Sequence, residues 1–283
     1  MELGINLGYV RRQRGNPQGR TFLAALQLCR DAGFAHLDYL SELSDDWERI
    51  AHQRRQELDS LGLVVHQAHC PFFRYQEDGT ARFAQLAPRA VRAAAILGAQ
   101  YLVVHADEYR VTDRFDAGEI LTATYGYLAP VVDLAKQHHV RVAVENLFED
   151  GHGPQVNGRS RYTATVEEVL AVIDRFNDPD VGCCWDFGHA RCSYGDRQLD
   201  ALRQIGPHLF CTHLHDNYYN KDLHLPPFFG STDWEAHMRY LRDSAYCGNL
   251  TYEFVYGAIP DALLPAYLRI AYQTGQHLLS MAQ

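Results

Sequence analysis

The sequence predicts an α/β protein that folds as one closed (β/α)8 barrel over residues 1–283. Three observations support this prediction. Short apolar or β-branched runs alternate with longer runs of helical periodicity, and there are eight of each. Strands that alternate with helices form right-handed βαβ units and a parallel sheet. The length of 283 residues suits a single barrel domain, because such barrels commonly occupy about 250 residues.

The expected strands are short runs rich in apolar or β-branched side chains. They lie at residues 2–8, 35–40, 63–69, 101–106, 140–146, 181–186, 209–215 and 249–254. Each is followed by a segment of helical periodicity, clearest at residues 21–33, 45–62, 81–98 and 165–176. The last of these opens on Thr165 with Glu168 three residues later, which is the pattern of a capping box.

An open, doubly wound sheet is the alternative architecture for alternating strands and helices. Its nucleotide-binding form carries a GxGxxG turn between the first strand and the first helix, and no such turn is present here. The sequence also contains no linker, no low-complexity segment and no repeat beyond the strand–helix unit. A single domain is therefore expected.

Composition and charge argue against several classes of protein. The net charge of −9 and the absence of a Lys/Arg-rich run make a nucleic-acid partner unexpected. The segment MELGINLGYV lacks the pattern of a signal peptide, and no run approaches the roughly 18 apolar residues of a membrane span. We therefore expect a cytoplasmic protein without membrane contact. Seven cysteines without regular spacing or a CxxC pair predict reduced packing residues.

Acidic and histidine side chains stand at the carboxyl ends of six successive expected strands. They are His69, His105, Glu145, Asp186, His189, His213, His215 and Glu253, and the loop after strand seven adds Asp222 and His224. The active site of such a barrel lies at this end. A single histidine there often only hydrogen-bonds a backbone carbonyl. Several acids close together repel one another unless a cation neutralises them, so the set predicts a divalent metal site.

The motifs that contain these residues resemble those of a known superfamily. They are HCPF (69–72), LVVHAD (102–107), AVEN (143–146), WDFGHA (185–190), HLHDN (213–217), DLHLPPFFGSTDW (222–234) and YEF (252–254). In this order they are similar to the xylose isomerase-like TIM barrel superfamily. That superfamily includes sugar phosphate isomerases and epimerases, inosose and dehydroshikimate dehydratases, and endonuclease IV of AP endonuclease family 2.

Resemblance to the ketose 3-epimerases of this superfamily implies one divalent metal ion and a pair of catalytic carboxylates. The implied metal ligands are Glu145, Asp186, His213 and Glu253. Glu145 and Glu253 are also the implied catalytic residues, one acting from each face of the substrate. The expected substrate-binding residues are His69, His105, His189, Trp185 and His224. An aromatic face such as that of Trp185 suits the apolar side of a sugar ring.

Resemblance to endonuclease IV implies a larger metal cluster. In that case a second or third ion would be bound by His69, His105, His189, Asp222 and His224. A mixed set of oxygen and imidazole ligands favours Mn²⁺ or Zn²⁺, with Co²⁺ and Mg²⁺ as alternatives. The segment from residue 213 to 234 nevertheless has the Leu-Pro-Pro, Gly and Asp-Trp spacing typical of the isomerase-like members.

Substrate contacts are less well specified by the sequence. Tyr219 stands where many epimerases of the superfamily have a substrate-binding arginine. Arg159, Arg191 and Lys221 are candidate phosphate contacts, which leaves open whether the substrate is phosphorylated. The further aromatic residues expected to help exclude water are Phe187, Phe228, Phe229 and Trp234.

The residues and the resemblance together predict a divalent-metal-dependent sugar (or sugar phosphate) isomerase or epimerase. It would abstract a proton next to a metal-bound carbonyl and form an enediolate intermediate. A dehydratase of the inosose or dehydroshikimate type is the first alternative. The others are an endonuclease IV-like phosphodiesterase with a multi-zinc site and a non-catalytic sugar-binding barrel. The expected partner is a small carbohydrate or polyol, and whether the chain forms a homo-oligomer stays open.

Overall fold

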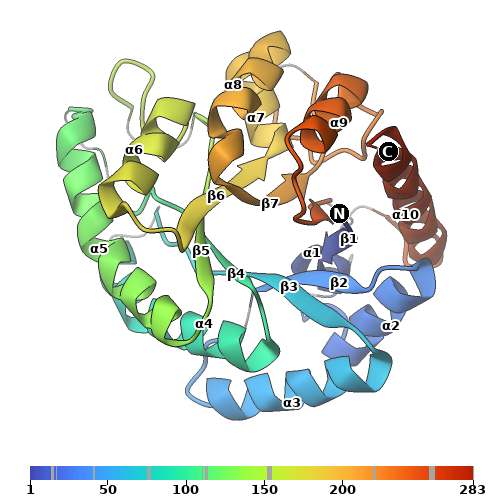
Figure 1. Ribbon diagram of the computed structural model, residues 1–283. Helices are drawn as coiled ribbons and strands as arrows, with labels where there is room; N and C mark the ends of the chain where they lie inside the picture. Colours follow the sequence, from blue (N-terminus) through green and yellow to red (C-terminus); the bar gives the residue numbers. More distant parts are fainter. Residues whose placement is uncertain are drawn as a thin grey trace.

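The barrel closes as the sequence predicts. The computed structural model describes residues 1–13, 16, 18–40, 42–74, 78–109, 111, 114–151, 155–218, 221–254 and 259–282. Among these residues, eight parallel strands follow one another around a closed barrel from β1 to β8, and β8 pairs with β1. Figure 1 shows the helices arranged around the outside of the barrel. The predicted (β/α)8 barrel is thus confirmed.

Every expected strand and helix has a counterpart in the structure. The strands are β1 (Leu3–Asn6), β2 (His36–Leu40), β3 (Val64–His69), β4 (Tyr101–Val104), β5 (Arg141–Glu145), β6 (Val181–Asp186), β7 (Leu209–Leu214) and β8 (Leu250–Tyr252). The α-helices are α1 (Leu7–Arg11), α2 (Phe22–Ala32), α3 (Trp47–Leu61), α4 (Gly79–Leu97), α5 (Ala117–Gln137), α6 (Val166–Phe176), α7 (Phe187–Tyr194), α8 (Gln198–Ile205), α9 (Trp234–Asp243) and α10 (Leu264–Met281). Two short 3-10 helices, η1 (Gly195–Arg197) and η2 (Gly206–His208), flank α8.

The first strand is shorter than expected because a helix begins immediately after Asn6. The Oδ1 atom of Asn6 accepts a hydrogen bond from the backbone N–H of Gly8 at 2.9 Å and so caps α1. The capping box expected for α6 is present. Thr165 and Glu168 each accept a hydrogen bond from the other's backbone N–H.

Apolar side chains pack on both sides of the sheet. The larger cluster unites the strands with the surrounding helices. The smaller one consists of Val103, Ala143, Cys184 and Cys211. All seven cysteines lie in the described part of the chain and are free. Five of them are buried, as the predicted packing role requires, whereas Cys192 is partly buried and Cys247 is exposed. None of the helices in the described ranges is long and apolar enough to cross a bilayer.

The smaller apolar cluster also determines where the polar side chains fall. Side chains two residues apart on a strand point to the same face. The residues two positions beyond the four members of this cluster are His105, Glu145, Asp186 and His213. They therefore share the inner face of the barrel and lie nearer its carboxyl end, where barrels of this kind build their sites.

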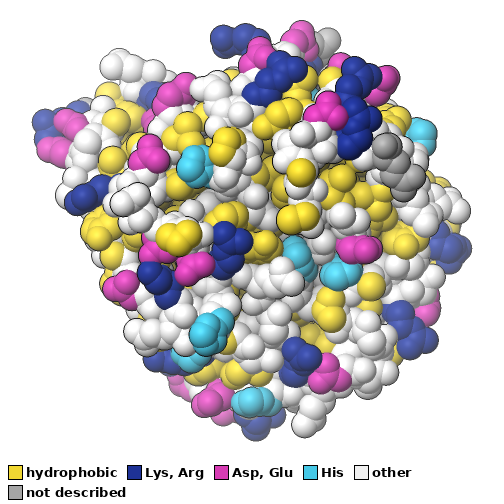
Figure 2. All heavy atoms as spheres, viewed as in Figure 1, with side chains coloured by type: hydrophobic (Ala, Val, Ile, Leu, Met, Phe, Trp, Pro, Cys, Tyr) yellow, Lys and Arg dark blue, Asp and Glu magenta, His cyan; other side chains and the backbone are white. Residues whose placement is uncertain are grey.

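Acidic and basic side chains are interspersed on the face of the molecule drawn in Figure 2. No broad basic surface is visible on that face. A protein that binds a nucleic-acid backbone in a sequence-independent way presents such a surface, because the phosphates carry most of the affinity.

Candidate active site and metal centre

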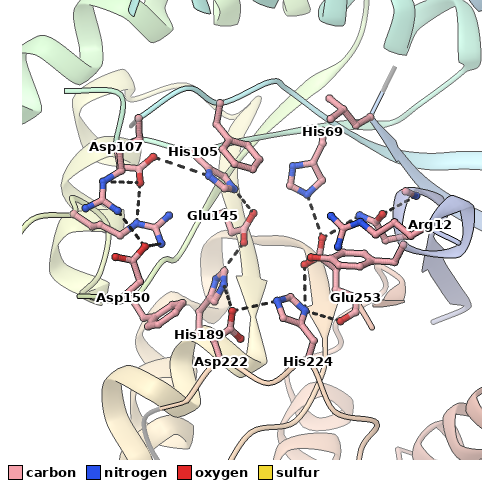
Figure 3. Close-up of a pocket in the computed structure, with 18 of the residues that line it drawn as sticks. Arg12, His69, His105, Asp107, Glu145, Asp150, His189, Asp222, His224 and Glu253 are labelled. Carbon is pink, nitrogen blue, oxygen red and sulfur yellow. Dashed lines mark hydrogen bonds and ion pairs between the residues drawn. The ribbon is translucent and has the colours of Figure 1, made fainter. Parts of the chain in front are cut away.

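A cavity opens at the carboxyl end of the barrel. Its volume is about 680 Å³, within the range of roughly 300–1,000 Å³ for small-molecule sites. It is lined by Asn6, Gly8, Tyr9, Arg12, Leu40, His69, Phe72, Arg74, His105, Asp107, Glu145, Phe148, Asp150, Arg161, His189, Lys221, Asp222, His224 and Glu253. Figure 3 shows histidine and acidic side chains of this set pointing toward one another across the cavity.

His213 is fully buried between two groups of carboxylates. Its Nδ1 atom lies 3.5 Å from Oε1 of Glu145 and 3.8 Å from Oδ2 of Asp186. Its Nε2 atom lies 3.2 Å from Oδ2 of Asp38 and 4.0 Å from Oε1 of Glu253. The imidazole of His213 therefore separates Glu145 and Asp186 from Asp38 and Glu253.

Both groups have the composition of a metal site. Glu145, Asp186 and His213 place ligand atoms within 4.8 Å of one another, and so do Asp38, His69, His213 and Glu253. Several of these atoms are buried and have no hydrogen-bond partner among the described residues: both ring nitrogens of His69, Nδ1 of His213 and Oδ1 of Asp38. Since buried polar atoms are normally hydrogen-bonded, this mixed oxygen and imidazole set fits a divalent cation.

The four ligands implied by the family resemblance are all brought together, but not in one group. Glu145, Asp186 and His213 share one group, whereas Glu253 is grouped with Asp38, His69 and His213. The structure thus divides the expected ligand set around the two ring nitrogens of His213.

Asp38 and Asn6 are the residues of this centre that sequence reasoning missed. The Nδ2 atom of Asn6 donates to Oδ2 of Asp38 at 3.1 Å and to Oε1 of Glu253 at 3.0 Å. A signal for Asp38 was present, because an acid stands between Leu37 and Tyr39 in a mostly apolar strand. Asn6 gave a weaker signal, because a polar residue at the end of an apolar run is also typical of a helix cap.

Neighbouring imidazoles favour the ionised form of the two predicted catalytic carboxylates. Burial opposes the ionisation of Glu145, but His213 and His105 lower its pKa well below its usual range. Burial also opposes the ionisation of Glu253, and the nearby charges of His213 and His69 lower its pKa. Metal ligands and general bases both require the deprotonated carboxylate.

The additional ligands implied by the endonuclease IV resemblance converge on the same cavity. His105 Nε2 lies 3.1 Å from Glu145 Oε2. Asp222 Oδ2 lies 3.1 Å from His224 Nε2 and 3.9 Å from His189 Nε2. Three more groups could hold an ion: His69 with His105 and Glu145, Asp186 with His189 and His215, and His215 with His224 and Glu253. The structure therefore places all five of these predicted residues at the site.

Asp186 both ends β6 and caps the helix that follows. Its Oδ1 atom accepts the backbone N–H of His189 at 2.7 Å, which is the N-cap hydrogen bond of α7. Its Oδ2 atom lies 3.1 Å from Nε2 of His215. The ring of His189 bonds the backbone carbonyl of Asn146 through Nδ1 at 3.0 Å. The capping geometry therefore explains the spacing of Asp186 and His189, because the turn keeps both side chains at the barrel mouth.

Trp185 is not at the cavity. Its side chain is fully buried in the apolar cluster that unites the strands with the helices. The reason is the alternation of side chains along a strand, since Asp186 faces the barrel interior. This placement contradicts the expected substrate contact of Trp185. Phe187 and Trp234 are also buried in the core, while Phe228 and Phe229 are exposed but do not line the cavity.

The aromatic side chains that do line the cavity are Tyr9, Phe72 and Phe148. Sequence reasoning missed them because Tyr9 lies in the short helix α1, whose start was expected as the end of a strand, and Phe72 and Phe148 lie in loops without a periodic pattern. Phe72 is 49% exposed and stacks on the His105 ring, with centroids 4.3 Å apart. Phe148 lies against the His189 ring at 5.1 Å.

The candidate phosphate contacts are mostly engaged elsewhere. Arg159 pairs with Glu149 and Glu168, and Arg191 pairs with Asp196 at 2.8 Å. Neither arginine lines the cavity, whereas Lys221 does. Tyr219, noted above for its departure from the epimerase pattern, lies outside the described residues.

Two other arginines, Arg74 and Arg161, line the cavity together with Asp107 and Asp150. We refer to these four residues as the Arg–Asp cluster.

Two curated proteins are similar to this chain over most of its length. The uncharacterized protein y4fM of Sinorhizobium fredii is 27% identical over 81% of this chain and 79% of its own length. An L-ribulose-5-phosphate 3-epimerase, UlaE of Escherichia coli, is 23% identical over 83% of each chain.

Solved structures share the fold at lower sequence identity. A D-psicose 3-epimerase crystallised in the presence of D-fructose superposes with a TM-score of 0.77, at 15% identity and over 99% of both chains. The IOLI protein with a bound zinc atom gives a TM-score of 0.72, at 17% identity, over 100% of this chain and 98% of its own.

A family model described as the xylose isomerase-like TIM barrel matches residues 26–269. This range runs from α2 into α10, so it takes in β2 to β8 and the cavity-lining residues from Leu40 to Glu253. The chain therefore belongs to the xylose isomerase-like TIM barrel family.

Proposed function

We propose that the protein is a divalent-metal-dependent isomerase or epimerase of a small sugar or sugar phosphate. The observation that carries the proposal is the placement of Glu145 and Glu253 on the two sides of His213. They lie 3.5 Å from its Nδ1 atom and 4.0 Å from its Nε2 atom, and both also line the cavity. The similarity to an L-ribulose-5-phosphate 3-epimerase supports the same chemistry.

Two carboxylates that face a shared cavity can exchange a proton with a substrate from two directions. One removes the proton next to the carbonyl group, and the other, in its protonated form, returns a proton. Return to the opposite face of the same carbon gives the epimer, and return to the neighbouring carbon gives the isomer. A carboxylate of low pKa is a weak base, so alignment of the substrate and exclusion of water must compensate. Tyr9, Phe72 and Phe148 are placed to exclude water.

The proposed metal ligands are Glu145, Asp186, His213 and Glu253, with Asp38 and His69 beside them. When bound, a divalent ion supplies positive charge that stabilises the negative charge developing on the substrate oxygen. Mn²⁺ or Zn²⁺ suits the donor set best, and Co²⁺ or Mg²⁺ is the alternative. The zinc atom in the structure of the IOLI protein, which shares this fold, supports zinc as a candidate. A cytoplasmic location and homo-oligomer formation stay predictions.

A second candidate function is phosphodiester hydrolysis with two or three metal ions. The observation in its favour is the convergence of His69, His105, His189, Asp222 and His224 on the same cavity. Clusters of two or more ions stabilise both the attacking and the leaving oxygen of a phosphodiester. A dehydratase would use the same two glutamates as the proposed epimerase.

The decisive experiment follows the exchange of substrate protons with solvent. Metal-loaded protein is incubated in D₂O with a panel of ketoses, and ¹H NMR follows the hydrogen next to the carbonyl group. We expect deuterium to enter the substrate and a product to form. Glu145→Gln and Glu253→Gln should each slow this exchange by about 100-fold or more.

The control is Glu235→Gln, which removes an exposed carboxylate of α9 that pairs with Arg239. Circular dichroism checks that all variants fold. Full activity of the Glu253→Gln variant would contradict the assignment of the two glutamates. A conjugated carbonyl product that absorbs in the ultraviolet would identify a dehydratase. Cleavage of abasic-site DNA by protein holding two or three zinc ions would identify the phosphodiesterase.

A further inference from the structure

The Arg–Asp cluster forms a charge-balanced group at one end of the cavity. Oδ2 of Asp107 accepts a hydrogen bond from Nε of Arg161 at 2.8 Å and lies 3.7 Å from Nε of Arg74. Oδ2 of Asp150 lies 3.2 Å from Nη1 of Arg74 and 3.2 Å from Nη1 of Arg161. Figure 3 shows Asp107 and Asp150 with guanidinium groups between them, at the end of the pocket opposite Arg12.

We propose that the Arg–Asp cluster is the subsite for an uncharged, hydroxyl-bearing end of the substrate. The enzyme then acts on a free ketose or a related uncharged polyol ketone and not on a sugar phosphate. This inference rests on the proposed function and narrows it, because the sequence left the phosphorylation state of the substrate open.

The first step of the argument is the charge of the cluster. Two guanidinium groups face two carboxylates, so these four side chains together carry no net positive charge to attract an anion. A phosphate monoester carries a charge of about −1.5 to −2 at neutral pH. At this end of the cavity it would lie against Asp107 and Asp150, and like charges placed together in a site oppose binding.

The second step is the chemistry of a hydroxyl group, which both donates and accepts hydrogen bonds. The cluster places carboxylate acceptors directly beside guanidinium donors, and all four side chains are more than four-fifths buried. Oδ1 of Asp107 and Nδ1 of His105 lie 4.0 Å apart. Neither atom has a hydrogen-bond partner among the described residues. A hydroxyl lying here can donate to Oδ1 of Asp107 and accept from a guanidinium N–H of the cluster.

The third step is the position of the cluster relative to the catalytic carboxylates. The opposite ring nitrogen of His105, Nε2, lies 3.1 Å from Oε2 of Glu145. A single imidazole ring therefore stands between Glu145 and Asp107. A small sugar whose reacting carbon lies at Glu145 has its next hydroxyl groups at the cluster. Phe148, 5.9 Å from the Arg161 guanidinium, and Phe72 offer apolar faces to the carbon atoms of the sugar.

The other cations near the cavity do not form a comparable anion site. Arg12 and Lys221 line the cavity and are exposed. Arg12 lies over the Tyr9 ring at 4.4 Å, and Lys221 is followed directly by Asp222. Arg159 and Arg191 point elsewhere, as described above. Among the described residues, the guanidinium groups buried at the cavity are those already paired with Asp107 and Asp150.

The test compares matched pairs of ligands on the Mn²⁺-loaded protein. Isothermal titration calorimetry measures the binding of L-ribulose and L-ribulose 5-phosphate, and of D-fructose and D-fructose 6-phosphate. We expect the free sugar of at least one pair to bind about tenfold or more tightly than its phosphate ester. Asp107→Asn leaves the positive charge of the arginines in excess. It should therefore weaken the binding of the free sugar, strengthen the binding of the phosphate ester, and so remove or reverse the preference for the free sugar. Asp150→Asn, at a less buried position, should change the preference in the same direction.

Asp196→Asn is the matched control, because Asp196 also pairs with a mostly buried arginine, Arg191, but lies away from the cavity. It should leave the preference unchanged. Thermal melting identifies any variant that does not fold, and Asp150→Asn keeps the test decisive if Asp107→Asn fails. Tighter binding of the phosphate esters by the wild-type protein would overturn the inference. The inference would also be overturned if the Asp150→Asn and Asp196→Asn variants had the same ratio of free-sugar to phosphate-ester affinity, because Asp150 would then have no effect on the preference.

Failure of the proposed function gives a different result. A clear preference for free sugars without any solvent deuterium exchange would leave the subsite in place and contradict the isomerase or epimerase. Deuterium exchange on phosphate esters alone would leave the enzyme in place and contradict the subsite. Absence of binding by every sugar and every ester would contradict both.

Discussion

Asp38 and His213 lie 175 residues apart in the sequence and share a buried hydrogen bond of 3.2 Å between Oδ2 and Nε2. Both side chains are fully excluded from solvent. Because a carboxylate can only accept, the Nε2 atom of His213 carries the proton. The Nδ1 atom therefore faces Glu145 and Asp186 as the candidate ligand nitrogen. Carboxylates that orient ligand histidines in this way are common beside metal ions.

Asp38→Asn should therefore weaken metal binding without removing a ligand from the Glu145 side. Loss of such an orienting carboxylate typically lowers metal affinity by about 10–100-fold. A competition titration of Zn²⁺ against a chromophoric chelator measures the effect. Asp59→Asn is the control, because Asp59 pairs with Arg55 on the exposed face of α3. Equal zinc affinity in the Asp38→Asn variant and the wild type would show that His213 does not need this partner.

Removal of the metal should lower thermal stability. Without a cation, the carboxylates of Glu145, Asp186 and Glu253 repel one another with only imidazoles between them. A bound metal ion also stabilises the folded state, because that is the state that binds it. A free metal concentration of about one hundred times Kd contributes about 2.7 kcal/mol. Scanning calorimetry with and without EDTA should show a lower Tm that recovers when Mn²⁺ or Zn²⁺ is restored. The Tm of the His213→Gln variant should not change when EDTA is added. A wild-type Tm that is the same with and without EDTA would argue against a resident ion.

Glu108 should make stability depend on pH. Burial raises the pKa of Glu108 to about 7, whereas an unfolded glutamate titrates near 4.3. Between these values the folded chain holds a proton that the unfolded chain has lost, so the free energy of unfolding falls as pH rises from about 4.3 to about 7. Glu108→Gln keeps the side-chain oxygen that accepts from the Phe73 N–H at 2.7 Å.

The Glu108→Gln variant should match the wild type at pH 5 and exceed its Tm by about 2 °C or more at pH 8. Melting curves at a series of pH values measure this difference. A Tm difference that does not change between pH 5 and pH 8 would mean that Glu108 does not titrate in this range. An opposite slope would mean that its pKa is lowered by folding.

Gly188 should tolerate no side chain. A Cβ atom at this position of α7 would lie 1.8 Å from Cε1 of His215, so the ring that pairs with Asp186 would have to move. Overpacking of this kind costs about 1–3 kcal/mol. Gly188→Ala should therefore lower Tm and weaken metal binding together.

The matched control is Gly126→Ala, in the interior of α5, where a Cβ atom meets nothing within 4 Å. Alanine should stabilise that helix by about 0.5–1 kcal/mol, because glycine loses more backbone entropy on folding. Differential scanning fluorimetry on both variants decides the matter. A Gly188→Ala variant as stable as the Gly126→Ala variant would show that the His215 ring can move aside without lowering the free energy of unfolding.

The fold could be predicted because its signals are local. Alternation between strand and helix patterns, the cap at Thr165 and the length of the chain all depend on residues close together in the sequence. The strand ends differ by one or two residues, most clearly in the first strand, where helix α1 begins directly after Asn6, in β4, which ends at Val104, and in the last strand, where Glu253 lies just beyond β8.

The site was predictable where a strand end carried the signal. His105, Glu145, Asp186 and His213 stand at such ends and share one face of the barrel. Trp185 was wrongly assigned because motif membership says nothing about which face a strand residue occupies. The Arg–Asp cluster could not be predicted, because its residues come from three irregular loops, after β3, β4 and β5, with no shared spacing.

The sequence by itself determined the order of strands and helices, the closed barrel and the end of the barrel that carries acids and histidines. Only the tertiary structure decided which side chains meet. Closure of the barrel brings Asp38 of β2 to His213 of β7 and Asn6 of β1 to Glu253 after β8. Hydrogen bonds between residues so far apart depend on the register and curvature of the whole sheet. No local pattern in the chain encodes that register.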